Sequence, residues 1–471
     1  MLFRWMIGQW GGFPDFDGHF HLTLVYRIAN QGLWAHIPWL PFTVLGEKGP
    51  DHQWLWHLML LPFAAIGDAD QALAWAAACN AAAVVAVTGF VMRMLGVPAA
   101  PLFAVLAVAA GTLMPYRLMM LRAQNIAIIF MMLSVWAMAR GRHRALAAIA
   151  FLFLQSYHAA VILLPMALVG CAAYSLAERR AVAGPLIAVA GGAAAALLAS
   201  PWFPRNIEYL LFHILFKTAA PLHGEQLSSL IGTEWYPPGW RNVLMQSWPA
   251  HLMLGAAIAS QLWRRTFRPD TVLAAGVALL SLALYFGAVR FAEYYIPFSA
   301  LAAGLAARDF SPARGMRIAL VAWTVLAASV GLTQAARVAL APPDHLAKIG
   351  ERLNQLGRPG EVVFNSSWSD FMALVWWAGG FRYINGLDGH YLAYADPARF
   401  AVWLALGSGQ MDDPAGAIEA AFGARFAVVA RQHERLARQL LASPRAALRV
   451  DSPEGWLFEI APAGKPIPPA R

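Results

Sequence analysis

The residues near the N-terminus whose types and spacing could do chemistry lie in the stretch PDFDGHFHL, residues 14–22. Asp15 and Asp17 flank Phe16, and Gly18 follows, a residue that lets the backbone approach a ligand closely. If this stretch lies at a membrane surface, Asp17 can hold a divalent cation or take a proton from a substrate. The alternative is that Asp17 caps a helix in a solvated loop, because aspartate is among the commonest N-cap residues.

Two later segments place charged side chains beside aromatic ones. FGAVRFAEYYIPF contains Arg290 and Glu293, which form either a functional group at the membrane or a structural ion pair. IGTEWYPPGW puts Glu234 beside Trp235. This acid either provides a metal ligand next to a sugar-stacking ring or lies in water within an aromatic belt. Less specific candidates are Glu47, Asp51 and His52 in one loop, and His158, which as a lone histidine is more typical of a satisfied core residue.

The composition is typical of a membrane protein. Of the 471 residues, 59% are hydrophobic and 13% are charged, which excludes an ordinary soluble globule and predicts a polytopic membrane protein. The formal charge of +9 does not indicate a nucleic-acid partner, because the basic residues form short clusters between apolar spans. The sequence has no phosphate-binding GxxxxGK[ST] loop, CxxC pair or HExxH helix, and its 2 cysteines predict no disulfide framework.

Apolar runs predict a series of membrane spans. They lie at about residues 72–92, 98–114, 123–139, 145–155, 159–177, 182–200, 246–263, 271–288, 294–307 and 318–338. Residues 19–31 are predicted to form a helix that lies at the membrane surface, and residues 54–66 a second helix that is interfacial or partly inserted. The first residues, MLFRWMIGQWGG, are too few for a span, so either the chain begins on the outer face or a first helix is missing from this reading frame.

Arginine clusters mark one side of the predicted weave as the cytoplasm. They are Arg93, then Arg140, Arg142 and Arg144, then Arg179 and Arg180, then Arg264, Arg265 and Arg268, then Arg308, Arg314 and Arg317. The opposite side collects a first external loop, 13–70, and a long external loop, 201–246. Cations near that side suit a phosphate, unless they only reach out from helix ends: Arg117, Arg122, Arg205, Lys217, Arg241 and Arg290.

The tail differs from the rest of the chain. Residues 342–471 spread their charges and alternate strand-like runs, such as EVVFN and ARFAVVA, with helical runs such as HERLARQLLAS. This pattern predicts a soluble α/β domain that follows a transmembrane domain at 1–341.

The order of these features resembles the GT-C superfamily of integral-membrane glycosyltransferases, which includes oligosaccharyltransferases and lipid-dependent aminoarabinosyltransferases. Asp17 in DFDGHFHL matches the first-loop catalytic acid of that superfamily, and Asp15 completes a DxD form. Glu234 and Arg290 match by position an acid of a late external loop and an arginine that holds the donor's lipid phosphate. The second external loop, MPYRLMMLRAQN, departs from the pattern, because it has no acid where oligosaccharyltransferases carry a DxE metal motif.

The resemblance implies a polytopic α-helical membrane protein, GT-C-like, with a C-terminal soluble α/β domain. It implies inverting transfer of a hexosyl, pentosyl or oligosaccharyl group from a polyprenyl-phosphate or polyprenyl-diphosphate donor. The acceptor would be a glycan, lipid or protein at the periplasmic face of a bacterial inner membrane, where the C-terminal domain would also lie. If a metal is used, Asp17 and Glu234 would hold Mg²⁺ or Mn²⁺.

Each candidate residue then has an expected role. The catalytic acids are Asp17 and Asp15. The donor phosphate is bound by Arg290, Arg122, Arg205 and Arg117. The acceptor or the surrounding shell is contacted by Glu234, Glu293, Glu47, Asp51, His52 and His158.

Two other functions remain open from the sequence. A polyprenyl-lipid flippase or transporter would have ionisable residues in the middle of its helices and internal repeats, whereas here the acids concentrate in outer loops. A non-catalytic relative that only binds polyprenyl lipids would account for the missing DxE motif.

Overall fold

The computed structural model describes residues 2–9, 16–32, 37–46, 49–112, 114–217, 232–265, 267–309, 314–335, 342 and 344–462. The chain divides into two compact units, each built from separate stretches of sequence. The first, here the helical unit, comprises Met1–Gly18, His52–Ile207 and Thr233–Leu340. The second, here the mixed unit, comprises His19–Asp51, Glu208–Gly232 and Ala341–Arg471.

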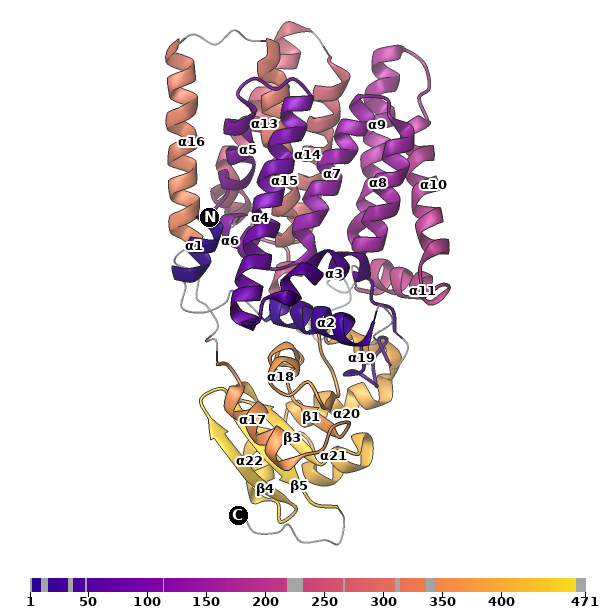
Figure 1. Cartoon of the computed structure of the whole chain (residues 1–471), viewed down its shortest axis with the longest axis vertical. Coiled ribbons are helices and arrows are strands. Elements are labelled where there is room, and N and C mark those ends of the chain that lie inside the picture. The colour runs from indigo at the N-terminus through magenta and orange to yellow at the C-terminus, as the bar shows by residue number, and fades with distance from the viewer. Residues whose placement is uncertain are drawn as a thin grey trace. The chain divides into compact units, whose positions relative to one another are not determined.

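Apolar helices make up the helical unit (Figure 1). Its longer helices are α4 (Ala69–Met94), α5 (Ala100–Ala109), α7 (Ala123–Ala139), α8 (His143–Ser156), α9 (Leu163–Glu178), α10 (Gly184–Ala199), α13 (Trp240–Arg264), α14 (Pro269–Gly287), α15 (Ala292–Ala306) and α16 (Arg314–Ala335). Shorter elements are α1 (Leu2–Gln9), α3 (Trp54–Leu60), η1 (Leu61–Ala65), α6 (Met114–Met119), η2 (His158–Ile162), η5 (Thr233–Trp235), η6 (Val289–Phe291) and η7 (Ala307–Asp309). Each predicted span thus corresponds to a helix.

Helix α15 forms the centre of this unit. It packs against α5, α13 and α14, and nearly all of its residues are buried. A helix that is apolar all round must be covered on every side, which explains this position. Among the described residues, three helical segments are long and apolar enough to cross a membrane by themselves: Ala69–Met94, His158–Glu178 and Pro269–Gly287.

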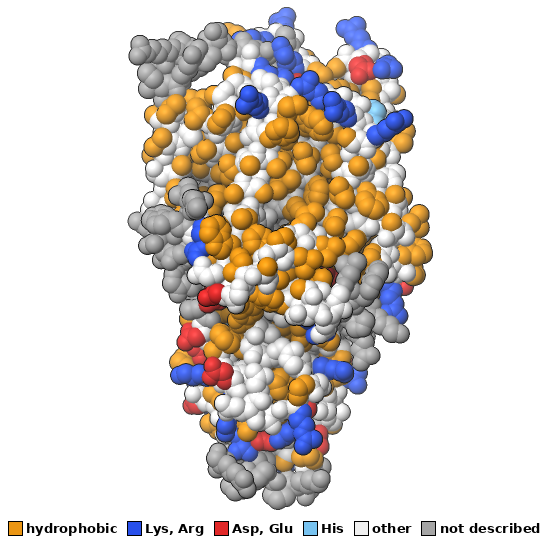
Figure 2. All heavy atoms as spheres, viewed as in Figure 1, with side chains coloured by type: hydrophobic (Ala, Val, Ile, Leu, Met, Phe, Trp, Pro, Cys, Tyr) orange, Lys and Arg blue, Asp and Glu red, His pale blue; other side chains and the backbone are white. Residues whose placement is uncertain are grey.

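Basic side chains gather at one end of the helical unit, above a broad apolar surface (Figure 2). The exposed arginines there include Arg93 at the end of α4, Arg140 after α7 and Arg264 at the end of α13. The start of α7 and the end of α14 therefore lie at the opposite end. This separation agrees with the clusters predicted on one side of the weave.

A five-stranded sheet organises the mixed unit, with strand order β2-β1-β3-β5-β4. The strands are β1 (Val362–Asn365), β2 (Arg382–Tyr383), β3 (Phe426–Ala430), β4 (Ala446–Ser452) and β5 (Gly455–Ile460). Strand β1 pairs in parallel with β2 and β3, whereas β5 pairs antiparallel with β3 and β4. The predicted combination of spanning helices and a C-terminal α/β region is confirmed.

The helices of the mixed unit bury their apolar sides against this sheet and one another. They are α17 (Ala347–Leu356), α18 (Phe371–Trp377), α19 (His390–Ala395), α20 (Pro397–Gly407), α21 (Pro414–Phe422), η8 (Arg431–His433) and α22 (Glu434–Ala442). The core joins Phe364 and Phe458 of the sheet to Leu406, Ile418 and Leu440 of these helices. Strands β3 and β5 are buried at every residue, as expected for strands inside a covered sheet.

Segments from earlier in the chain complete the mixed unit. Helix α2 (Asp17–Gln31) begins in the helical unit and continues in the mixed unit, and π-helix η3 (Phe212–Lys217) follows α11 (Arg205–Leu211). In the stretch 37–46, the indole N–H of Trp39 donates to the carbonyl of Gly379 at 2.7 Å, and the Trp39 carbonyl accepts from the Tyr383 N–H at 2.7 Å. The tail therefore shares its core with residues far upstream.

Candidate active site

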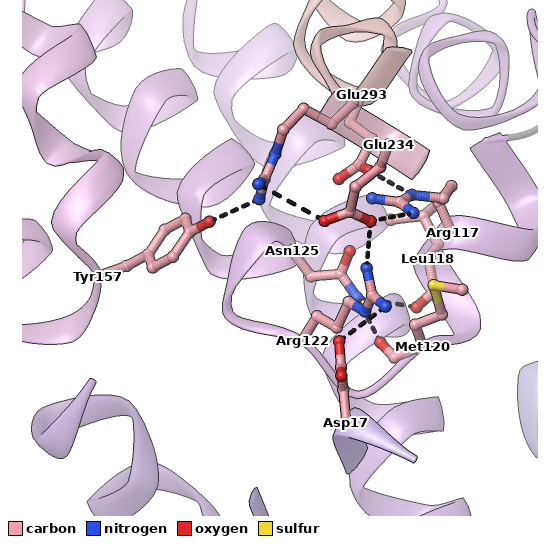
Figure 3. A network of polar contacts seen from close by, with 10 residues as sticks. Asp17, Arg117, Leu118, Met120, Arg122, Asn125, Tyr157, Glu234 and Glu293 are labelled. Carbon is pink, nitrogen blue, oxygen red and sulfur yellow. Dashed lines mark hydrogen bonds and ion pairs between the residues drawn. The ribbon is translucent and has the colours of Figure 1, made fainter. Parts of the chain in front are cut away.

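The connection between α6 and α7 positions two arginines at the end of the helical unit away from the basic clusters. Arg117 lies on α6, and Arg122 precedes the first residue of α7. The Asn125 side-chain amide donates to the carbonyls of Leu118 and Met120, at 2.9 and 3.1 Å, and so fixes the turn between them (Figure 3). These hydrogen bonds satisfy buried backbone carbonyls in the segment that joins the two arginines.

Arg122 bridges two acids that are far apart in sequence. One of its terminal nitrogens lies 2.7 Å from Asp17 Oδ2, and the other lies 2.7 Å from Glu234 Oε2 (Figure 3). The side chain of Arg122 is 12% exposed, compared with 26% for Asp17. A planar guanidinium can bind two carboxylates at once, which a lysine ammonium does less well.

Two further arginines reach Glu234. Arg117 Nη1 lies 2.9 Å from Glu234 Oε2, and Arg117 Nε also bonds to Glu293. Arg290, on η6, places Nη1 3.5 Å from Glu234 Oε1 and donates from Nη2 to the Tyr157 hydroxyl at 2.9 Å. Its guanidinium also lies over the Trp235 ring, 4.1 Å from the centroid, in cation–π geometry. We call Asp17, Arg117, Arg122, Glu234, Arg290 and Glu293 the arginine–carboxylate cluster.

The electrostatics of the arginine–carboxylate cluster centre on Glu234. Burial by itself would raise the pKa of this carboxyl group, but Arg122, Arg117 and Arg290 outweigh that effect and hold the pKa well below its usual range. Glu234 is therefore ionised at any physiological pH. The expectation that this acid might lie in water is wrong, because arginines surround its carboxylate.

Gly18 lets the start of α2 pack closely against α4 and the segment that precedes α7. A Cβ atom at this position would lie 2.8 Å from Leu73 Cδ1 and 3.2 Å from Leu121 Cβ. The sequence suggested that Gly18 makes room for a ligand, but here it makes room for neighbouring side chains. Gly18 therefore affects the site only indirectly. Close packing of this turn places the Asp17 carboxylate against the Arg122 guanidinium.

Asp17 and Glu234 do not fit a cation held between them as they lie. Both carboxylates bind Arg122, whose positive charge occupies the place that a bridging Mg²⁺ or Mn²⁺ would take. Among the described residues, no three His, Cys, Asp or Glu side chains form a group that could hold a metal ion. We therefore derive no catalytic step through a metal.

The structure brings six of the predicted site residues together and leaves others elsewhere. Glu293 binds Arg117, so the Arg290–Glu293 pair predicted as one alternative is replaced by partners on other elements. The His158 ring lies 4.9 Å from the His52 ring and 4.5 Å from that of Tyr157. Arg205 is exposed at the start of α11.

The remaining predicted residues fall outside the arginine–carboxylate cluster or outside the described residues. Asp51 is 6% exposed and belongs to the mixed unit. Asp15 and Glu47 lie outside the described residues, as does the side chain of Lys217. Two contributors were not foreseen from the sequence: Tyr157 and Asn125. Tyr157 directly precedes the candidate residue His158 in LQSYHAA. Its aromatic hydroxyl at the end of a predicted span could have indicated a role in the site.

An apolar groove lies between helices of the same unit. It has a volume of about 480 Å³ and is lined by side chains of α5, α13, α15 and α16, including Leu252, Ala303 and Trp323. A smaller pocket of about 110 Å³ shares Trp323 and reaches Gly111 and Gln246. Gly111 precedes α6, the helix that carries Arg117.

Comparison with known proteins shows similarity at the level of structure. No protein-family model matches the sequence, and no curated protein matches it. The archaeal oligosaccharyltransferase AglB from Archaeoglobus fulgidus, in complex with an inhibitory peptide and a dolichol-phosphate, superposes with a TM-score of 0.60 at 12% identity, covering 97% of this chain and 71% of that one. ArnT from Cupriavidus metallidurans, bound to undecaprenyl phosphate, superposes with a TM-score of 0.57 at 14% identity, covering 97% and 96%.

Proposed function

The chain has the GT-C fold, and on that premise we propose that it is a membrane glycosyltransferase that moves a sugar from a polyprenyl-phosphate or polyprenyl-diphosphate donor to an acceptor. The arginine–carboxylate cluster is the proposed active site. The donor's phosphate binds the arginines, and Asp17 acts on the acceptor. We further propose that the site faces the periplasm of a bacterial inner membrane, because the basic clusters occupy the other end of the helical unit.

The single observation that carries this proposal is the convergence of three arginines on Glu234, beside a second acid, Asp17, that is partly open to solvent. Arg117, Arg122 and Arg290 all contact the same carboxylate, and Arg122 also contacts Asp17. Guanidinium groups bind phosphate oxygens with strong, charge-assisted hydrogen bonds. A site for an anion next to a carboxylate is what transfer from a phosphate-linked donor requires.

The chemistry can be written with these residues alone. The acceptor nucleophile attacks the anomeric carbon from the face opposite the phosphate, and the bond between that carbon and the phosphate oxygen breaks. The electron pair of that bond leaves with the lipid phosphate, where the arginines offset the developing charge. Asp17 receives the proton of the acceptor, or orients the nucleophile that loses it.

The apolar groove supports a donor with a lipid tail. Its lining is almost entirely hydrocarbon and aromatic, and the smaller pocket extends toward the helix that carries Arg117. A polyprenyl chain placed there would stay in an apolar environment.

Donor turnover by wild type and Asp17→Asn tests the proposal. The purified protein is given a panel of polyprenyl-phosphate and polyprenyl-diphosphate sugars with an envelope extract as acceptor, and release of the lipid phosphate is followed by mass spectrometry. We expect turnover in wild type and a loss of at least about 100-fold in the variant, the scale of general acid–base catalysis. Parallel reactions with EDTA, Mg²⁺ or Mn²⁺ measure metal dependence, and we expect EDTA to leave turnover unchanged.

Asp270→Asn provides a matched control. Asp270 pairs with Arg308 at 2.7 Å and is 21% exposed, close to the exposure of Asp17, but it lies at the start of α14, at the other end of the unit. Equal turnover in wild type and Asp17→Asn would remove Asp17 from the mechanism. Binding of polyprenyl lipids without any turnover would favour the flippase or the lipid-binding protein.

A further inference from the structure

Glu234 occupies the position in the arginine–carboxylate cluster where an external anion would bind. Its Oε2 atom accepts from Arg117 at 2.9 Å and from Arg122 at 2.7 Å, while its Oε1 atom faces Arg290 at 3.5 Å. Both oxygens are thus directed at cations from different elements. Figure 3 shows the contacts of Glu234 with Arg117 and Arg122. Phosphate and carboxylate oxygens bind guanidinium groups in the same geometry.

The surroundings explain why an internal anion is needed. Three partly buried guanidinium groups repel one another, and leaving such charges unpaired is strongly unfavourable. Asp17 pairs with Arg122 and Glu293 pairs with Arg117. Glu234 adds a third negative charge that contacts all three arginines when no ligand is present. A phosphate could provide it equally well, so the two anions are alternatives for the same position.

The arginine–carboxylate cluster also has donor capacity that a carboxylate does not use. The Nη2 atom of Arg117 is buried and has no hydrogen-bond partner among the described residues. A buried donor without a partner costs free energy, and ligands often satisfy such groups. A phosphate offers more acceptor oxygens than the carboxylate that now fills the position.

Glu234 belongs to a very short element. It lies on η5, a single turn of three residues, where the Tyr236 N–H donates to the Thr233 carbonyl at 3.2 Å. The Val289 N–H donates to the Tyr236 carbonyl at 3.1 Å, and the Arg290 guanidinium stacks on the Trp235 ring. Because η5 is a single turn of three residues, Glu234 can move without breaking the hydrogen bonds of a longer helix.

We propose that Glu234 is an internal competitor of the donor phosphate, held by Arg117, Arg122 and Arg290 in the ligand-free protein and displaced when the phosphate binds. The inference rests on the proposed function, since it takes the phosphate of a lipid-linked sugar as the ligand. It assigns Glu234 to selection of the ligand rather than to a metal or to the acceptor. A neutral polyprenyl lipid cannot displace the carboxylate, so only a charged head group opens the site.

Binding of a polyprenyl monophosphate to the full-length protein tests the displacement. Dissociation constants are measured for wild type, Glu234→Gln and Glu234→Asp, with the corresponding polyprenyl alcohol and with inorganic phosphate. If Glu234 fills the position nine-tenths of the time, removing its charge tightens monophosphate binding about tenfold, because the apparent affinity scales with the competent fraction. Glu234→Asp keeps the charge and should stay near wild type. Binding of the alcohol should not change.

Hydrogen exchange gives a second readout that does not depend on affinity. Ligand binding ordinarily protects the surrounding amides, but displacement of Glu234 should accelerate exchange in residues 232–239 and at Val289. Slower exchange there, or an affinity of Glu234→Gln equal to or weaker than that of wild type, would overturn the proposal.

Failure of the inference is distinguishable from failure of the proposed function. If wild type binds the monophosphate and turns over a donor, but Glu234→Gln binds no tighter, only the displacement is refuted. If neither protein binds the lipid phosphate and neither turns over a donor, the proposed function itself fails. A tenfold gain for inorganic phosphate as well would assign the effect to the phosphate group and not to the lipid.

Discussion

At the scale of single residues, the candidate site depends on arginines that each contact more than one partner. Arg122 binds Asp17 and Glu234, while Arg290 binds Glu234, the Tyr157 hydroxyl and the face of Trp235. The sequence indicated these arginines as phosphate ligands from their position near the outer ends of spans. It could not show that Glu234 neutralises them, because such pairing depends on loops more than 100 positions apart coming together.

A second acid with an unusual environment lies in the mixed unit. Burial raises the pKa of Asp370 to about 7, although hydrogen bonds with Ser367 and Ser369 lower it in part. An acid whose pKa is higher in the folded than in the unfolded protein stabilises the fold when protonated. This contribution is fully present below pH about 4 and is lost as the pH rises to about 7.

The stability of Asp370→Asn relative to wild type should therefore increase as the pH rises. Asparagine cannot ionise, so the difference in Tm between the variant and wild type should shift in favour of the variant between pH 5 and pH 8, by the amount that roughly 2–3 kcal/mol produces. Thermal unfolding of the full chain measures this.

The control is Asp396→Asn, at a residue whose pKa is lowered by the backbone N–H of Arg399. Asp396 is ionised at both pH values, so the effect of this substitution should not change between them. A pH-independent difference for Asp370→Asn as well would refute the raised pKa.

At the scale of elements, most helices and strands could be predicted because each has a strong local pattern. The apolar runs at 123–139 and 271–288 became α7 and α14 nearly residue for residue, and the EVVFN and ARFAVVA runs became β1 and β3. Helix α13 was harder, because it begins at Trp240, inside the predicted loop 201–246, and continues past non-helical Ser247 and Pro249. An internal proline normally argues for a helix boundary, and here the two segments are joined across a kink.

The start of α2 shows how one glycine governs an element. Gly18→Ala would place a methyl group against Leu73 and Leu121, so the first turn must shift and Asp17 must move from Arg122. We expect turnover to fall roughly tenfold to 100-fold, because small misplacements of a catalytic group are costly. Stability should change by about 1 kcal/mol or less, since alanine favours a helix and offsets part of the crowding.

A second substitution separates crowding from other effects. Leu73→Ala removes the side chain nearest to the new methyl group, so the double variant should recover part of the lost turnover. Gly67→Ala, at a position with nothing within 4 Å, should behave like wild type. No recovery in the double variant would mean that Gly18 matters for a reason other than space.

At the scale of the whole molecule, the tail from 342 onward could be predicted as an α/β region. The sequence did not reveal which other segments belong to the same compact unit. The mixed unit also includes His19–Asp51 and Glu208–Gly232. The sequence predicted a helix at 19–31 that lies on the membrane surface. An amphipathic pattern shows that one side of a helix is covered, but it does not reveal which partner covers it. Contacts such as Phe20 with Phe371, and Phe42 with Phe422, assign that partner.

Residues 342–471 produced alone should therefore be poorly folded. Trp39 is 1% exposed in the full chain and bonds to Gly379, so the isolated tail would lose this cover and expose apolar surface. We expect it to bind a hydrophobic dye and to be digested by protease faster than the same tail fused to residues 16–46. Equal resistance of the two proteins would show that the tail is an independent domain.

The shared core also imposes a delay between synthesis and folding of the mixed unit. Trp39 and Gly379 are 340 positions apart, so the upstream partner leaves the ribosome long before the downstream one exists. At about 5–20 residues per second, the wait is roughly 20–70 s. During that interval Trp39, Phe20 and Phe42 lack their partners in the tail, which are Gly379, Phe371 and Phe422. A holding chaperone or the lipid surface itself would have to shield these side chains until translation ends.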